Sequence, residues 1–259
     1  MEYDQIKYLP FGDRGVVVEF GDEISLEINK KVRSMYLAIT QQNEPNSELR
    51  TPNLKGIISM NPTYRSLLIE YDPIIIGYSE IVSALKEIET KIQTMILPEP
   101  DIFIVPTLYG GEYGPDIATV MEKNNLSEEE VIAIHSGTDY LVYMFGFTPG
   151  FSYLGGMDKR LETPRLENPR IKIAGGSVGI AGSQTGIYSI DSPGGWQLIG
   201  HTPIKIYDPY RQKPILHKVG DYIRFRKIDK AEYESIAEKV ARNVYEYEFG
   251  VRNSEFGIK

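Results

Sequence analysis

The chain has 259 residues, with 28 basic and 36 acidic side chains, so its formal net charge is −8. Hydrophobic residues make up 41% of it, and no apolar run reaches the roughly 20 residues of a membrane span, which is the composition of a soluble globular protein. The sequence contains no cysteine, which excludes disulfides and thiolate chemistry, and its acidic balance argues against binding to nucleic acid. The amino-terminal residues lack the pattern of a secretion signal, so we expect a cytoplasmic protein.

The first hundred residues alternate between strand-like runs and amphipathic helical patterns. Strands are predicted at 16–20, 56–60, 66–71 and 102–105. Apolar residues recur at helical spacing within 28–39 and within 81–92. The order strand, helix, strand, strand, helix, strand predicts an α+β ferredoxin-like domain over residues 1–97. Because no polar cluster marks this half, a scaffold or interaction role is favoured over a catalytic one.

A mainly-β domain is predicted over residues 101–228, after the proline-rich boundary at 97–100. Residues 146–200 hold 12 of the 24 glycines. Short strand-like runs bounded by glycine or turn residues suggest a barrel or sandwich; they lie at 171–174, 177–181, 185–190, 196–200, 204–207 and 221–227. A further strand is expected at 140–147.

Three helices are predicted around this barrel. One begins near Pro115, and the next begins at Ser127, which forms a capping box with Glu130. The last begins near Asp229, within a segment of helix and tail at 229–259. Its apolar face is expected to carry Tyr233, Ile236, Val240 and Val244.

Several familiar catalytic devices are excluded or disfavoured. The three histidines, His135, His201 and His217, are far apart, so a metal site is not expected. No Gly-Lys-Ser/Thr sequence is present, which excludes a P-loop. Residues 175–179 match G-x-S-x-G around Ser177, but strand-like sequence follows where a nucleophile elbow needs a helix. Ser177 is therefore predicted to be a barrel residue.

The segment 159–172 has a local charge of +3 and contains two Pro-Arg pairs, which end at Arg165 and Arg170. Guanidinium groups suit carboxylates and phosphates, so an anion site is favoured over a solvated basic loop. His135 is the best general acid/base candidate, although a lone histidine is more often structural. Trp196 is either a core residue or an aromatic wall for a small ligand, and the sequence does not separate these alternatives.

The longer motifs together resemble the allophanate hydrolase subunit 1 family. The resemblance is carried by 109–116 (YGGEYGPD), 131–136 around His135, and 146–156 (GFTPGFSYLGG). It continues through the Pro-Arg pairs, 174–182, 184–188 and 192–200. The resemblance implies that the barrel is cyclophilin-like, and the ferredoxin-like prediction for the first half agrees with the family architecture.

The resemblance also implies a function. It indicates a subunit, inactive alone, of an ATP-dependent 5-oxoprolinase that converts 5-oxo-L-proline to L-glutamate. The implied partners are an allophanate hydrolase subunit 2 family protein and a LamB/YcsF-type subunit. ATP, with Mg²⁺, would bind at a site shared with or supplied by them. The alternative is a regulatory inhibitor of autophosphorylation by a sensor histidine kinase.

Carried over position by position, the resemblance implies three catalytic residues: His135, Arg165 and Gln184. The implied substrate-binding residues are Thr148, Pro149, Gly150, Phe151, Arg170, Tyr188, Trp196 and Gln197, with no metal ligand. The arginines would hold a carboxylate or phosphoryl group, Gln184 the lactam amide, and His135 would move protons. Two positions depart from the family pattern: Leu108 replaces a frequent cysteine and His201 a common arginine. If that arginine binds an anion, His201 would make the interaction weaker and pH-dependent.

Overall fold

A computed structural model describes residues 1–41, 54–93 and 95–250. The chain divides into two compact units, Met1–Glu99 and Pro100–Lys259, which are described separately. Parts of the predicted polar stretch after the first helix and of the predicted tail, at 42–53 and 251–259, lie outside the described residues.

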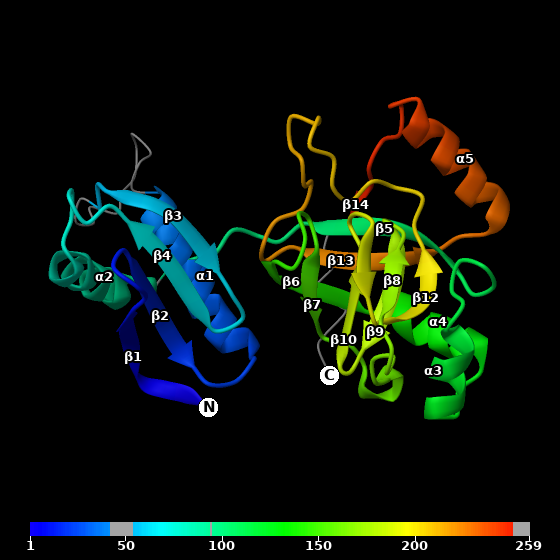
Figure 1. The fold of residues 1–259 in the computed structure, drawn as a ribbon, viewed down its shortest axis with the longest axis horizontal. Helices are drawn as coiled ribbons and strands as arrows, with labels where there is room; N and C mark the ends of the chain where they lie inside the picture. The colour runs from blue at the N-terminus through cyan, green and yellow to red at the C-terminus, as the bar shows by residue number, and fades with distance from the viewer. Residues whose placement is uncertain (42–53, 94, 251–259) are drawn as a thin grey trace. The chain divides into compact units, whose positions relative to one another are not determined.

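The first unit is a four-stranded antiparallel sheet with two helices packed against it (Figure 1). Its elements are β1 (Glu2–Pro10), β2 (Gly15–Gly21), α1 (Leu26–Gln41), β3 (Ile57–Pro62), β4 (Ser66–Tyr71) and α2 (Tyr78–Ile92). The strand order is β1-β2-β4-β3. The apolar stripes of both helices meet the inward residues of β2 and β4 in one core, because each stripe can be buried only against another element.

The predicted ferredoxin-like order is not confirmed in this unit. The strand expected at 102–105 belongs to the second unit, and β1, which was not predicted, pairs with β2 at the edge of the sheet. β1 escaped prediction because it is polar: Ile6 and Tyr8 pack against the core, while several of its neighbours face solvent. An edge strand with one wet face carries a weak apolar signal.

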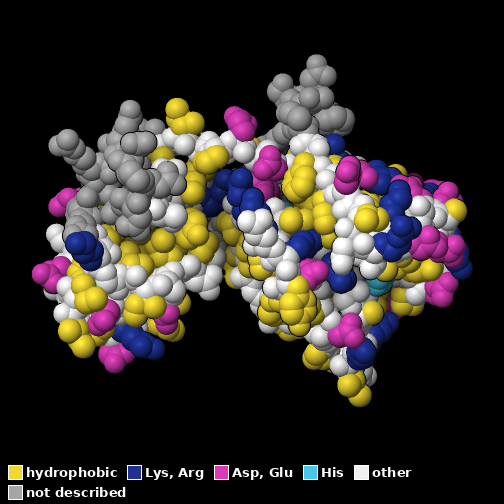
Figure 2. All heavy atoms as spheres, turned by 90° about the horizontal axis from the view of Figure 1, so that it is seen from above, with side chains coloured by type: hydrophobic (Ala, Val, Ile, Leu, Met, Phe, Trp, Pro, Cys, Tyr) yellow, Lys and Arg dark blue, Asp and Glu magenta, His cyan; other side chains and the backbone are white. Residues whose placement is uncertain are grey.

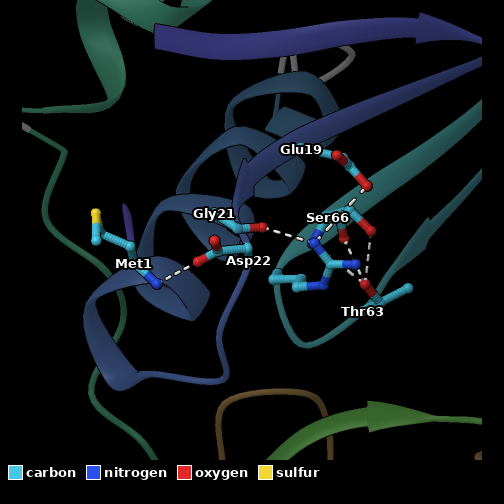
Figure 3. A network of polar contacts seen from close by, with 7 residues as sticks. Met1, Glu19, Gly21, Asp22, Thr63 and Ser66 are labelled. Atoms are coloured by element: carbon cyan, nitrogen blue, oxygen red, sulfur yellow. Dashed lines mark hydrogen bonds and ion pairs between the residues drawn. The ribbon is translucent and has the colours of Figure 1, made fainter. Parts of the chain in front are cut away.

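Polar contacts close the turn between β3 and β4 (Figure 3). Thr63 Oγ1 lies 2.8 Å from Ser66 Oγ, and the Thr63 amide donates to the carbonyl of Ser66 at 2.8 Å. Arg65 donates to the carbonyl of Gly21 at 2.8 Å and so ties this turn to the end of β2. The amino group of Met1 binds Asp22 just beyond it.

The second unit is a nearly closed, mainly-β barrel, which confirms the predicted barrel. Its strands are β5 (Ile102–Tyr109), β6 (Asp139–Phe145), β7 (Ser152–Gly155), β8 (Arg170–Ile173), β9 (Ser177–Ala181), β10 (Gln184–Ile187), β11 (Ser192–Gly194), β12 (Gln197–His201), β13 (Tyr222–Lys227) and β14 (Phe249–Gly250). The main sheet runs β10-β9-β12-β5-β13-β6-β7, and β10 also lies against β7. β5 and β13 pair in parallel, β14 joins β5, and β8 pairs separately with β11.

Three helices accompany the barrel: α3 (Ile117–Asn124), α4 (Glu128–Ser136) and α5 (Lys230–Ala241) (Figure 1). The capping box of α4 is confirmed, since the Glu130 amide donates to Ser127 Oγ and the Ser127 amide to Glu130 Oε2. Asp229 caps α5 by accepting from the Glu232 amide at 2.8 Å. None of the helices in the described residues has the length and apolar character to cross a bilayer.

Two details of the barrel prediction are wrong. Residues 204–207 form no strand: Ile204 and Ile206 are buried, but Tyr207 makes only an isolated bridge to Ile215. The apolar face of α5 does not reach Val244, because the helix ends at Ala241 and Val244 is 58% exposed. In both cases side-chain burial was mistaken for regular secondary structure, since the apolar pattern reports burial more directly than hydrogen bonding.

Candidate functional site

Three of the predicted substrate-binding residues form one aromatic cluster: Phe151, Tyr188 and Trp196. The Phe151 ring lies 5.8 Å from Tyr188 and 5.6 Å from Trp196, centroid to centroid, in edge-to-face geometry. Ile173, Ala181 and Leu198 complete the cluster. All three aromatic side chains are buried. They come from the starts or ends of three different strands, so the barrel fixes their positions relative to one another.

The loop between β6 and β7 continues this cluster toward solvent. The Thr148 amide donates to the carbonyl of Gly146 at 2.7 Å, which closes a three-residue turn around Phe147. Phe147 has a φ of 61°, a conformation that costs a non-glycine residue about 1–3 kcal/mol. Its ring is 58% exposed and meets Phe151 edge-on at 5.5 Å.

The remainder of this loop is held in place from two sides. Ser189 Oγ donates to the carbonyl of Pro149 at 2.6 Å and lies 3.3 Å from Thr148 Oγ1. Gly150 has a φ of 78°, and a Cβ there would come within 2.7 Å of Tyr207. The chain can therefore approach Tyr207 this closely only with glycine at position 150. The structure thus joins the predicted loop 148–151 to the aromatic cluster.

Arg170 binds the segment that carries Trp196. Its guanidinium donates to the carbonyl of Trp196 at 3.3 Å and to Asp116 Oδ1 at 2.7 Å. The other oxygen of Asp116 accepts from the Leu198 amide at 2.6 Å. Asp116, Arg170 and the start of β12 therefore form one clamp, which stabilises the backbone around Trp196.

Sequence reasoning missed Asp116 as a site residue. Its position just before α3 resembles a helix cap, but its side chain makes no cap hydrogen bond. It lies 54 residues before Arg170 in the chain. The available signal was the combination of a carboxylate at a helix start and an arginine elsewhere, which is too common to pair two residues.

We expect Asp116→Ala to lower the free energy of unfolding by about 2–4 kcal/mol, because it leaves a half-buried guanidinium and a buried amide without an acceptor. Urea denaturation measures this change. Asp158→Ala is the matched control, since it removes an exposed ion pair with Arg160 and should cost no more than about 1 kcal/mol. Equal losses in the two variants would contradict the clamp.

Arg165 contrasts with the other cations of its segment. Arg160 pairs with Asp158, and Lys172 pairs with Asp191. Arg165 is exposed, and no hydrogen bond or ion pair joins it to the described residues. It does act on Tyr188: burial raises the pKa of the Tyr188 hydroxyl, and contact with the Trp196 backbone and the positive charges of Arg165 and Arg170 oppose this rise. The exposed guanidinium of Arg165 is thus directed to the same region as the aromatic cluster.

The two predicted glutamines flank the segment that carries Arg165. Gln197 is buried, and its Nε2 donates to the carbonyl of Pro164 at 3.0 Å, while its Oε1 has no partner in the described part of the chain. Gln184 begins β10 and is half-buried. The turn before it is fixed to Thr163 by backbone hydrogen bonds between Gly182 and Thr163. Both contacts restrict the position of the Pro164-Arg165 pair.

His135 lies in the barrel core and makes its contacts there. It is fully buried, with Nε2 2.7 Å from Thr185 Oγ1 and Nδ1 2.8 Å from the Tyr109 hydroxyl. Because Thr185 donates its own proton to the carbonyl of Gly179, it accepts from Nε2–H, and Nδ1 accepts from Tyr109. Burial lowers the pKa of His135 to about 3. The neutral imidazole therefore links α4, β5, β9 and β10 from the inside.

The two departures from the family pattern are neighbours in space. Leu108 on β5 pairs across the sheet with His201 on β12. His201 Nε2 donates to the carbonyl of Gly175 at 3.0 Å, and its Nδ1 accepts from the Tyr233 hydroxyl at 2.9 Å. Burial lowers its pKa. His201 thus connects the loop before β9 to α5.

The electrostatics of the region are those of paired charges. On the face shown in Figure 2, Lys and Arg side chains of the second unit lie interspersed with Asp and Glu side chains. The described residues contain no group of three or more His, Asp or Glu side chains placed to hold a metal ion. The arrangement can bind an anionic group at Arg165, beside an apolar aromatic surface.

A small α+β unit followed by this barrel defines the class of protein. The chain belongs to the carboxyltransferase domain family, subdomains C and D, which matches residues 6–217. It is 39% identical over 238 residues to the B-type subunit of 5-oxoprolinase from Bacillus subtilis (strain 168), covering 88% of this chain and 95% of that protein. It is 37% identical over 214 residues to the protein of the same name in Escherichia coli O157:H7, covering 83% and 92% of the two chains.

A solved structure supports the fold. The urea amidolyase of K. lactis superposes with a TM-score of 0.74 at 23% identity, over 95% of this chain and 16% of that one. This similarity shows a shared fold with one part of a much longer protein. Together the comparisons confirm the family resemblance that the sequence motifs predicted.

Proposed function

We propose that this chain is the B-type subunit of an ATP-dependent 5-oxoprolinase, which converts 5-oxo-L-proline to L-glutamate with hydrolysis of ATP. One observation carries the proposal: the chain is similar along nearly its whole length to a 5-oxoprolinase protein of that subunit type, and spans 95% of it. The names of these relatives favour the enzyme component over the regulatory alternative, an inhibitor of a sensor histidine kinase.

The proposed substrate has chemistry that the candidate site can recognise. 5-Oxoproline is a small ring with a carboxylate, a lactam amide and an apolar edge of methylene groups. We assign Arg165 to the carboxylate or to a transferred phosphoryl group, since its guanidinium is exposed and unpaired with the described residues. Gln184 is assigned to the amide. The aromatic cluster and the loop 148–151 would supply the apolar contact.

Arg170 and His135 receive positioning roles in this proposal. Arg170 is bound to Asp116 and to the carbonyl of Trp196, so it would orient Trp196 and add positive charge near the substrate. His135 holds Thr185, the neighbour of Gln184 on β10, from the core of the barrel. In place of the general acid/base role suggested by sequence, we propose that His135 fixes the strand that presents Gln184.

The lactam is stabilised by amide resonance, so activation of its carbonyl oxygen by phosphorylation before hydrolysis is a reasonable route. We propose that ATP, with Mg²⁺, binds at a site shared with or supplied by partner subunits. The partners proposed are an allophanate hydrolase subunit 2 family protein and a LamB/YcsF-type subunit. Guanidinium groups such as that of Arg165 would offset the charge that develops on a transferred phosphoryl group.

The test is ADP release by the chain co-purified with both partners, with and without 5-oxoproline. We expect release of ADP that depends on 5-oxoproline and is matched by glutamate formation, and no turnover by the chain alone. Each partner is omitted in turn as a control for contaminating ATPases. A complex shown by gel filtration to be assembled, but not stimulated by 5-oxoproline, would overturn the proposal.

A further inference from the structure

Phe147 has a backbone conformation that its residue type disfavours. Among the described residues, the non-glycine residues with positive φ are Asn125, Phe147 and Asn243. Asn125 and Asn243 follow the carboxyl ends of α3 and α5, where asparagine commonly takes this conformation. Phenylalanine has no short polar side chain to stabilise it. The strain at Phe147 therefore has no explanation in helix capping.

The strained turn places an aromatic ring in solvent. The ring of Phe147 is 58% exposed, although it follows a strand and precedes the buried Phe151. A glycine at 147 would take the same φ without strain, as Gly150 does in the same loop. The contact with Phe151 uses the ring in an edge-to-face pair and leaves much of it accessible. The sequence thus keeps an exposed ring at a position that the backbone alone would give to glycine.

The surroundings of this ring favour a small, partly apolar anion as its ligand. Phe147 contacts Phe151, which contacts Tyr188 and Trp196. The hydroxyl of Tyr188 is in turn within the electrostatic influence of Arg165 and Arg170. The loop is fixed by Ser189 and by the close approach of Gly150 to Tyr207, so the ring is held in place before any ligand arrives.

We propose that Phe147 is a substrate-contacting residue, whose exposed ring packs against the methylene edge of the lactam while Arg165 binds its carboxylate. This inference rests on the proposed function and adds a residue that selects for the ring of the substrate. Strain is concentrated at positions where geometry serves binding, which accounts for a phenylalanine at this turn.

The test uses the assembled three-subunit complex and compares Phe147→Ala, Phe147→Gly and Phe147→Tyr. We expect the Ala and Gly variants to raise KM for 5-oxoproline by about three- to tenfold with kcat little changed, because a contact made equally in ground and transition states is lost. The Tyr variant keeps the ring and should retain the KM of the unchanged chain. Phe11→Ala, at a phenylalanine that is 57% exposed in the first unit, is the matched control.

Thermal unfolding of the isolated chain tests the strain separately. The Gly variant should unfold about 2–4 °C above the Ala variant, although both lack the ring, because glycine accepts a positive φ. At an unstrained loop position, alanine would be at least as stable as glycine.

Three outcomes would overturn the inference. An unchanged KM in Phe147→Ala would show that the ring does not contact substrate. Loss of assembly in Phe147→Ala, seen by gel filtration, would make Phe147 a partner contact instead. Absence of 5-oxoproline-dependent ADP release from the complex with the unchanged chain would overturn the proposed function, and this inference with it. The first two leave the unchanged complex active, so they are distinguishable from the third.

Discussion

Arg165→Ala is expected to lower kcat/KM for 5-oxoproline by about 10²–10³-fold in the assembled complex, through loss of a guanidinium that binds developing or fixed negative charge. The same variant should leave the free energy of unfolding within about 0.5 kcal/mol of the unchanged chain, because Arg165 is exposed and unpaired with the described residues. The combination of a large kinetic loss and a negligible stability loss is the signature of a substrate-binding residue.

The measurement is steady-state ADP release at varied 5-oxoproline, paired with urea denaturation of the isolated chain. Arg165→Lys should recover only part of the activity, since an ammonium group cannot reproduce the two-pronged geometry of guanidinium on a carboxylate. Arg160→Ala is the control, because Arg160 is an exposed arginine of the same segment and is already paired with Asp158. Similar activity losses in the Arg160 and Arg165 variants would show that general charge matters and would remove Arg165 from the site.

The second large effect is on stability. His135→Ala should destabilise the chain by about 3–5 kcal/mol, because it opens a cavity and leaves the Tyr109 hydroxyl without an acceptor and Thr185 without a donor. Urea denaturation at pH 7 measures this. Near-equal stability of the variant and the unchanged chain would contradict the hydrogen-bond chain described for the barrel core.

The pH dependence of stability provides an independent test. The folded-state pKa of His135 is lowered to about 3 and that of His217 to about 4 by burial, below the value of 6.5 for an exposed histidine. Below pH 6.5 the unfolded chain therefore binds protons that the folded chain excludes. The histidine contribution is fully present above pH 6.5 and is lost as the pH falls toward the folded pKa, by about 1.4 kcal/mol per pH unit for each histidine.

His135→Gln separates the titrating group from its hydrogen bonds. The variant should be less stable than the unchanged chain at pH 7, but its stability should fall less steeply between pH 6.5 and pH 4. His217 would supply the remaining histidine part of the slope in both chains. Parallel pH profiles for the two chains would show that His135 is accessible to protons in the folded state, which the buried geometry excludes.

Two kinds of feature in this chain were accessible from local sequence. The capping residue Ser127 with Glu130, and the helix start at Asp229, involve residues three apart, so the sequence contains the whole interaction. The strands at 177–181 and 222–227 were likewise predicted, because alternating or continuous apolar runs report directly on burial in a barrel. The family resemblance also depended on ordered motifs along the chain, and comparison confirmed it.

The site itself depended on contacts between distant residues. The motif resemblance named Phe151, Tyr188 and Trp196, but only the barrel brings their rings together. The same motifs named His135 without indicating that both ring nitrogens are used inside the core. Burial of a single polar residue is decided by which elements pack over it, and that information is spread across the whole chain.

Helix caps, most of the barrel strands, the family and the identity of most candidate site residues could thus be obtained without coordinates. Three features could not: β1 completes the first sheet, Asp116 binds Arg170, and Phe147 stands exposed on a strained turn. The difference is one of range, because caps and periodicity act over a few residues. Strand pairing, ion pairing and loop strain depend on residues that meet only after folding.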